Sequence, residues 1–256
     1  MIKLDARSWG FIVVAVLASS IFVRLGVWQL DRLAERRARN ADHAALTTLP
    51  PLEVSEASRV PPTDSLLWRR VRLTGTLDFE NEIIIRARAA YGSPGVYVVT
   101  PLRFEGGPAV LVLRGWLPAA DGLSADVTAA RPGSDKRERS RIVQITGQAR
   151  PGESPASIPA RRKLFDDREH LVLGRLDIEA AESGLGESLV NAWILPDSSI
   201  EVGGEITPRS VTLPPPSDGP HLLYAIQWFS FAAITVAGAV LFIFTRRREG
   251  SERSSA

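Results

Sequence analysis

The 256-residue sequence contains no cysteine. A chain without thiols has no disulfide framework, no thiolate nucleophile and no thiolate metal site, so protein classes built on those features are excluded. Lysine is scarce too, because Lys3, Lys136 and Lys163 are the only ones and every other basic residue is arginine. The arginines are interspersed with acidic residues, and the formal net charge is +2. Since no basic face interleaved with aromatic residues stands out, we expect no binding of nucleic acid.

Motifs of hydrolases and nucleotide-binding enzymes are also missing. The three histidines, His43, His170 and His221, lie in neither a G-x-S-x-G nor an H-E-x-x-H setting, and no Walker loop or G-x-G-x-x-G follows a predicted strand. Gly92 and Gly95 flank a proline, which is typical of a turn. The sequence therefore gives no signal of a hydrolase or of a nucleotide-binding enzyme, and an unfamiliar active site in the central region stays open.

Long apolar runs are present at both ends of the chain. The first, Trp9–Trp28, has 20 residues with one charge, Arg24, and forms about 30 Å of helix at ~1.5 Å per residue. That length matches the hydrocarbon core of a bilayer, the two tryptophans suit its interfaces, and Arg24 is close enough to one end to snorkel. A cleaved signal peptide is the alternative, since Lys3 and Arg7 precede the run, but no clear A-x-A site follows it. We predict a transmembrane helix over residues 9–30.

The second run, Leu222–Thr245, has 24 residues without a charge and ends at three consecutive arginines, 246–248. By the positive-inside rule these arginines place the C-terminal tail, residues 246–256, in the cytoplasm. A second span over residues 221–245 then puts residues 1–8 there as well, and residues 31–220 on the outer side. Four arginines just after the first run argue for the opposite orientation, but they begin a long translocated region, for which the rule is weak.

The central region reads as a mainly antiparallel β domain. It begins with a helical stalk, because Gln29–His43 contains no helix breaker. From Trp68 onward, apolar residues alternate with polar ones, as in a half-buried strand. Further strands are predicted at Glu82–Arg88, Gly95–Leu102, Ala109–Trp116, Ile142–Ala149 and Ser188–Leu195.

Two other segments complete this prediction. Asp177 can cap a short helix that runs through Ser183, and the polar stretch Ala119–Arg139 reads as a long mobile loop. The predicted fold class is a membrane protein with two transmembrane α-helices, one near each terminus. These helices flank a mainly antiparallel β domain on the extracytoplasmic side, which carries a short helix and for which a barrel-like closure is one arrangement.

The outward ends of the two spans carry polar and aromatic residues. On the second helix, Tyr224, Ala225 and Trp228 follow His221 on one face; the first helix presents Leu25, Trp28, Gln29, Arg32 and Arg36 at a similar depth. One interpretation is an interfacial aromatic belt with a histidine that caps a helix. The other is a haem site, because imidazole binds iron, aromatic rings pack on a porphyrin and arginines pair with propionates.

Four segments resemble the surfeit locus protein 1 family: LGVWQLDR at Leu25–Arg32, YGSPGVYVVTPL at Tyr91–Leu102, VLRGWLP at Val112–Pro118 and HLLYAIQWF at His221–Phe229. Their order and spacing and the two-span architecture agree with the family over nearly the whole chain. The resemblance implies a non-enzymatic assembly factor for cytochrome c oxidase that binds haem a transiently during maturation of the catalytic subunit I. Haem a synthase is a further candidate partner. SDGP at Ser217–Pro220 departs from the asparagine-containing approach expected before the histidine.

The resemblance also implies the residues of the site. His221 is the position of the family's candidate haem ligand, and it is the metal ligand that we predict. The predicted cofactor-binding residues are His221, Tyr224, Trp228, Trp28, Gln29, Arg32 and Arg36. Predicted contacts with subunit I are Arg114, Gly115 and Trp116. A cofactor-free, membrane-anchored scaffold that holds subunit I is the alternative function. Because the first span begins at residue 9, a mitochondrial transit peptide has no room, and a bacterial cytoplasmic membrane is expected.

Overall fold

The computed structural model describes residues 6–55, 62–121, 125–133, 142–153, 161–165, 168–214 and 216–252. The chain folds as two units. Met1–Asp42 together with Pro214–Ala256 form the first, and His43–Leu213 form the second. Most of the predicted stalk therefore belongs to the same unit as the apolar runs. The predicted cytoplasmic ends, residues 1–8 and 246–256, lie in part outside the described residues.

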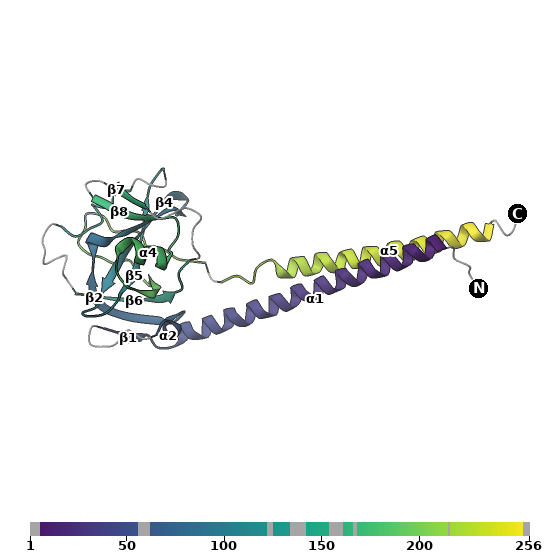
Figure 1. Ribbon diagram of the computed structural model, residues 1–256, viewed down its shortest axis with the longest axis horizontal. Helices are drawn as coiled ribbons and strands as arrows, with labels where there is room; N and C mark the ends of the chain where they lie inside the picture. The colour runs from purple at the N-terminus through teal and green to yellow at the C-terminus, as the bar shows by residue number, and fades with distance from the viewer. Residues whose placement is uncertain are drawn as a thin grey trace. The chain divides into compact units, whose positions relative to one another are not determined.

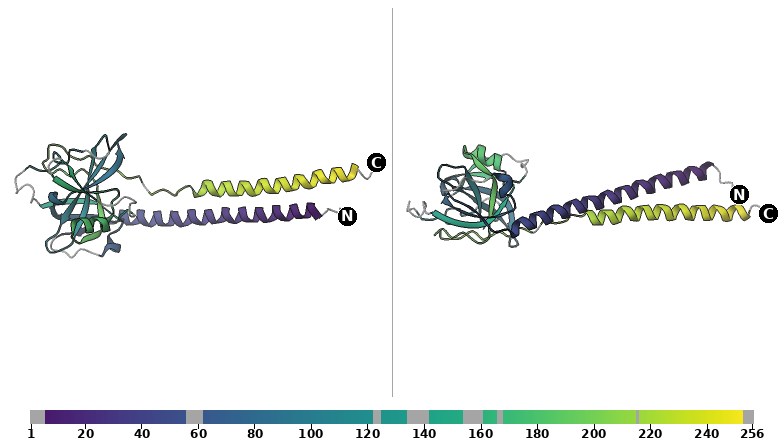
Figure 2. Two further views of the ribbon diagram at one scale, coloured as in Figure 1. Left: turned by 45° about the horizontal axis from the view of Figure 1, so that its top comes forward. Right: turned by 90° about the horizontal axis from the view of Figure 1, so that it is seen from below.

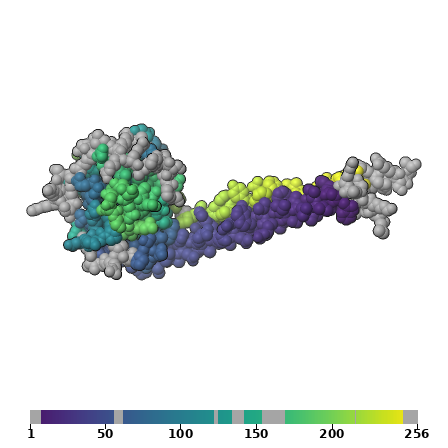
Figure 3. All heavy atoms as spheres, in the orientation of Figure 1, coloured from purple at the N-terminus to yellow at the C-terminus, as the bar shows by residue number. Residues whose placement is uncertain are grey.

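The first unit consists of two long helices, α1 (Ala6–Thr48) and α5 (His221–Glu252). They lie side by side in the two views of Figure 2, and their side chains meet in the space-filling view of Figure 3. No proline interrupts α1, so the helix continues from the apolar run into the stalk as predicted. Both helices are long and apolar enough to cross a membrane. Large apolar side chains such as Leu223 and Ile234 are 71% and 67% exposed, which suits a surface that faces lipid.

Five strands of the second unit close into a barrel (Figure 1). Around the ring they are β2 (Arg70–Leu77), β6 (Ile142–Arg150), β9 (Leu189–Pro196), β5 (Ala109–Pro118) and β4 (Ser93–Arg103). Pairing of β2 with β4, with Leu77 opposite Leu102, closes the ring. The neighbours are antiparallel except β5 and β9, which are parallel. Closure protects the strand edges that an open sheet would leave unpaired.

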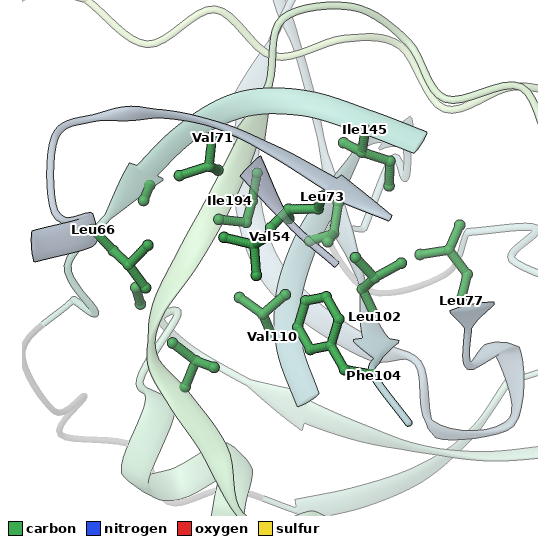
Figure 4. Close-up of a cluster of buried hydrophobic side chains, with 14 of the residues drawn as sticks. Val54, Leu66, Val71, Leu73, Leu77, Leu102, Phe104, Val110, Ile145 and Ile194 are labelled. Carbon is green, nitrogen blue, oxygen red and sulfur yellow. The ribbon is translucent and has the colours of Figure 1, made fainter. Parts of the chain in front are cut away.

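The barrel interior is apolar because alternate residues of each strand point inward. On β2, Val71, Leu73 and Leu77 are buried, whereas Arg72, Thr74 and Thr76 are half-buried. They meet apolar side chains from the other strands, among them Leu102, Val110, Ile145 and Ile194 (Figure 4). The structure therefore confirms both the strand that the alternation predicted and the face of that strand that is buried.

The sheet extends beyond the barrel on both sides. Next to β4 follow β3 (Ile83–Ala90), β8 (Arg168–Leu173) and β7 (Arg161–Phe165), and β1 (Leu52–Val54) lies parallel to β2. The sequence did not reveal β1, β7 or β8. Two of them form parallel pairs, β1 with β2 and β8 with β3, and no tight-turn signal in the sequence marks a parallel pairing.

Short helices connect the strands. Asp177 caps α4 (Ile178–Leu185) as predicted, because its Oδ1 accepts a hydrogen bond from the Ala180 amide at 3.2 Å. The helix ends at Gly186 in the left-handed conformation. A one-turn helix, α2 (Thr63–Leu66), precedes β2.

A 3-10 turn, η1 (Phe79–Asn81), connects β2 to β3 and is capped by Asp78. The Asp78 carboxylate accepts hydrogen bonds from the Glu80 amide, the Asn81 side chain and the Arg103 guanidinium. Burial alone would raise the pKa of Asp78, but the hydrogen bonds from Asn81 and Arg103 outweigh that effect and lower it.

The described part of the predicted loop Ala119–Arg139 contains no helix or strand, as expected, but it packs on the sheet. Val127 and Ala130 are fully buried and pack on apolar residues of β3, β4 and β5, and Arg131 is 7% exposed. The small apolar residues scattered along this polar stretch are sufficient to attach it to the sheet. Residues 122–124 and 134–139 of the predicted loop lie outside the described residues.

Candidate functional site

The predicted site residues of the two spans meet where α5 begins. His221 is the first residue of α5, and its Nδ1 lies 2.9 Å from Oε1 of Gln29 on α1. Gln29 is only 8% exposed, and burying its polar side chain between two apolar helices would cost free energy without a partner. The hydrogen bond to His221 supplies that partner. The bond joins positions 192 residues apart in sequence.

The turn before α5 is held by the stalk part of α1. Arg37 donates a hydrogen bond to Asp218 at 2.9 Å, and Asn40 donates to the same carboxylate at 3.3 Å. The hydrogen bond from Arg37 lowers the pKa of Asp218. Gly219 follows with φ +74°, a conformation that glycine adopts readily, and the chain enters α5 after Pro220. SDGP, which departs from the family pattern, thus forms an ordered turn that places His221 beside Gln29.

The predicted aromatic residues separate into two groups. Trp228 stacks on Phe22 with ring centroids 5.8 Å apart and meets Phe231 at the same distance, so its ring takes part in the packing of the two helices. Tyr224 and Trp28 are 47% and 44% exposed. Of the predicted aromatic residues, Tyr224 and Trp28 therefore have exposed rings within one helical turn of His221 and Gln29, respectively, whereas Trp228 packs between the two helices.

Both predicted arginines already have partners within the chain. Arg32 forms an ion pair with Glu35 at 2.8 Å, in which both side chains are about half exposed, and its guanidinium lies 5.8 Å from the Trp28 ring. Arg36 Nε donates to the Ser217 carbonyl at 3.2 Å. An exposed i,i+3 pair contributes only about 0.2–0.5 kcal/mol, so Arg32 can exchange Glu35 for an external anion at little cost.

A buried charged network in the second unit was not predicted from the sequence. Glu82, fully buried, accepts hydrogen bonds from Arg114 Nη1 and Arg131 Nε, both at 2.6 Å, and from Thr100 Oγ1 at 2.9 Å. Arg131 also donates to His170 Nε2 at 2.9 Å. Because these residues are 18 to 88 positions from Glu82, no local pattern could have indicated the network.

The predicted contact of Arg114, Gly115 and Trp116 with subunit I stays a prediction, and two of these side chains are buried in this fold. Arg114 and Trp116 are 1% and 2% exposed. Arg114 binds Glu82 and the Ala130 carbonyl, which fastens the 125–133 segment to β5. Both buried residues therefore contribute to the stability of the fold.

Gly115 and Trp116 hold the last part of the barrel chain. Trp116 exchanges backbone hydrogen bonds of 2.8 and 2.9 Å with Arg209, and the Arg209 guanidinium lies 6.0 Å from the indole. Gly115 has φ +152°, and a Cβ there would lie 2.5 Å from the Arg209 carbonyl oxygen. Trp116 Nε1 also donates to the Arg88 carbonyl at 3.0 Å. The RGW motif therefore fixes the segment that leads towards α5.

The model of the SURF1 family, the surfeit locus protein 1 family of the resemblance above, matches residues 16–233. The chain belongs to the SURF1 family. A SURF1-like protein of Rickettsia felis is 27% identical over 241 residues, covering 91% of this chain and 96% of that protein. An uncharacterized SURF1-like protein of Mycobacterium tuberculosis is 26% identical over 248 residues, with 93% and 85% covered. A SURF1-like protein of Monosiga brevicollis is 27% identical, with 89% and 84% covered.

SURF1 membership confirms the resemblance and the membrane-anchored fold class. Which group could bind at the site depends on the chemistry of its side chains. No cluster of three or more His, Asp or Glu side chains that could hold a metal ion is found among the described residues. A single imidazole suits haem, because the porphyrin itself supplies the other nitrogen ligands of the iron. The residues around His221 fit that group. Gln29 is hydrogen-bonded to its Nδ1, the rings of Tyr224 and Trp28 are exposed, and Arg32 follows Trp28 by one helical turn.

Proposed function

We propose that this SURF1 family member is an assembly factor for cytochrome c oxidase that binds haem a at the outward ends of its two helices and assists its delivery to subunit I. His221 would hold the iron, Tyr224 and Trp28 would pack against the porphyrin, and Arg32 would meet a propionate. Haem would supply an iron that binds imidazole. The observation that carries the proposal is the 2.9 Å hydrogen bond between His221 and Gln29, which unites the two separately predicted halves of the site.

The proposed location is a bacterial cytoplasmic membrane, with both termini in the cytoplasm and the barrel outside. Two apolar helices and the arginines 246–248 support this orientation, and several curated relatives come from bacteria. We propose subunit I and the lipid bilayer as partners, haem a synthase as a further one, and no catalytic activity of the chain itself.

Absorption spectroscopy of the purified full-length protein tests the proposal. Protein from cells that make haem a should carry a haem spectrum, and His221→Ala should lose or shift it. His43→Ala is the matched control, because this ring stacks on Trp68 at 4.0 Å within the second unit and should leave the spectrum unchanged. Wild-type protein without haem, or a His221→Ala protein with the wild-type spectrum, would refute the ligand assignment.

A cofactor-free scaffold is the second candidate, and the pairing of the arginines favours it. Arg36, which was predicted to bind the cofactor, instead donates a hydrogen bond to the Ser217 carbonyl and helps to hold the turn. A scaffold predicts that His221→Ala still co-purifies with subunit I and still supports normal oxidase levels. Loss of oxidase with retained subunit I binding would favour the haem role instead.

A further inference from the structure

The hydrogen bond between His221 and Gln29 determines more than the proximity of two helices. The acceptor is the amide oxygen of Gln29, which has no hydrogen to donate. His221 must therefore carry a hydrogen on Nδ1, and a neutral imidazole with Nδ1–H has its lone pair on Nε2. The geometry thus selects one of the two tautomers of the ring.

The side chain of Gln29 is suited to hold that tautomer. It is 8% exposed, it lies on the opposite helix, and the amide is confined by the packing of α1 on α5. A glutamine on a free surface would sample many rotamers, whereas a buried one keeps its oxygen aimed at the ring. The orientation of His221 is therefore set by a residue of the first helix.

The Nε2 side of the ring is left accessible by the turn. Among the described residues, no hydrogen bond reaches this atom, and its neighbour is Gly219. A Cβ at Gly219 would lie 3.4 Å from Cδ2 and 3.6 Å from Nε2 of the histidine. The absence of a side chain at residue 219 thus keeps the approach to the lone pair open.

We propose that Gln29 is a positioning residue, which holds His221 as the Nδ1–H tautomer and so presents Nε2 to a haem iron; the identity of that iron rests on the proposed function. Histidines that bind metals commonly donate their second N–H to a carbonyl or carboxylate, which fixes the ring and raises the basicity of the binding nitrogen. Gln29 would therefore touch the histidine rather than the porphyrin. The sequence alone had predicted that Gln29 binds the cofactor directly.

The first test needs no haem. NMR of protein labelled with ¹⁵N-histidine distinguishes the tautomers at a pH where the ring is neutral, and His221→Ala identifies the signal among the three histidines. We expect Nδ1–H for His221 in the wild type and in Gln29→Glu, and a shift towards Nε2–H in Gln29→Leu. Gln227→Leu makes the same chemical change at an exposed position of α5 and should leave the signal unchanged. An Nε2–H ring in the wild type would overturn the proposal, because the amide would then donate instead of accept.

The second test measures haem binding. Loss of such a partner typically weakens metal affinity by about 10–100-fold, so Gln29→Leu should bind haem that much more weakly than Gln227→Leu. Gln29→Glu, a stronger acceptor, should keep the affinity and lower the midpoint potential of the iron, whereas Gln29→Leu should raise it. Equal affinities and potentials for Gln29→Leu and wild type would also overturn the positioning role.

The two proposals fail separately. If His221→Ala keeps the haem spectrum while the tautomer depends on Gln29, the orientation of the ring stands and the haem assignment falls. If haem binds through His221 but neither the tautomer nor the potential responds to Gln29→Leu, the haem assignment stands and the positioning role falls.

Discussion

Glu82→Gln should destabilise the barrel more than any exposed charge substitution. The Glu82 carboxylate lies between the guanidinium groups of Arg114 and Arg131, with N···O distances of 2.6 Å to each, and Thr100 adds a hydrogen bond at 2.9 Å. The side chain of Arg131 is 6% exposed and those of Glu82 and Arg114 are fully buried. Glutamine keeps the shape but removes the negative charge that two buried cations share.

The magnitude follows from the burial. Removing one partner of a buried ion pair costs about 3–5 kcal/mol, because the remaining charge stays desolvated without compensation. In a unit of this size, 1 kcal/mol corresponds to a shift of about 2–4 °C, so the melting temperature should fall by about 6–20 °C. Glu53→Gln, the same change in an exposed pair with Arg72, should cost about 0–1 kcal/mol.

Thermal unfolding of the full chain in detergent, followed by near-ultraviolet circular dichroism, measures the difference between the two variants. The signal reports the packing of aromatic residues such as Trp116 and Trp193, which are buried in the second unit. If Glu82→Gln melts within about 3 °C of Glu53→Gln, the negative charge of Glu82 does not stabilise the barrel through Arg114 and Arg131, and the reasoning is refuted.

Three further outcomes are expected. The folded pKa of Asp78 lies below its unfolded value of about 3.9, so the stability that its carboxylate contributes is present above that value and lost as pH falls through the folded pKa. In measurements of the free energy of unfolding against pH, Asp78→Asn should reduce this loss. An unchanged slope would contradict the assignment. Gly115→Ala should destabilise the chain by about 1–3 kcal/mol through its φ of +152° and its contact with a backbone oxygen, whereas Gly107→Ala, with 3.7 Å of room, should not; equal denaturation midpoints would contradict this. Since the chain has no cysteine, Glu105→Cys at an exposed turn gives a single label site, and an impermeant maleimide should react with it in intact spheroplasts; labelling only after lysis would reverse the proposed orientation.

Local patterns were sufficient for the helices and for most of the barrel strands. An uninterrupted apolar run without proline leaves the backbone no alternative to a helix in a bilayer, so α1 and α5 could be predicted from composition and length. Alternation along Arg70–Leu77 predicted both the strand and its buried face. The cap at Asp177 is equally local, because its partner is the amide of Ala180.

Other features depend on residues that are distant in sequence. The strand β8 pairs in parallel with β3, and its place in the sheet follows from that neighbour. The segment 125–133 reads as polar, yet Arg131 is bound to Glu82, 49 residues away. The RGW motif was predicted to contact subunit I from the family resemblance, and the burial of Arg114 and Trp116 follows from the packing of the folded chain.

The sequence by itself determined that the chain has two apolar helices around a β domain, since hydrophobic length and period are properties of consecutive residues. It also placed His221 and Gln29 at similar depths of their helices. Only the tertiary structure decided that these two side chains bond to each other, that Trp228 packs between the helices, and that Arg114 is enclosed with a carboxylate. The physical reason is that hydrogen bonds and burial depend on which surfaces meet, and that is fixed by the packing of elements far apart in the chain.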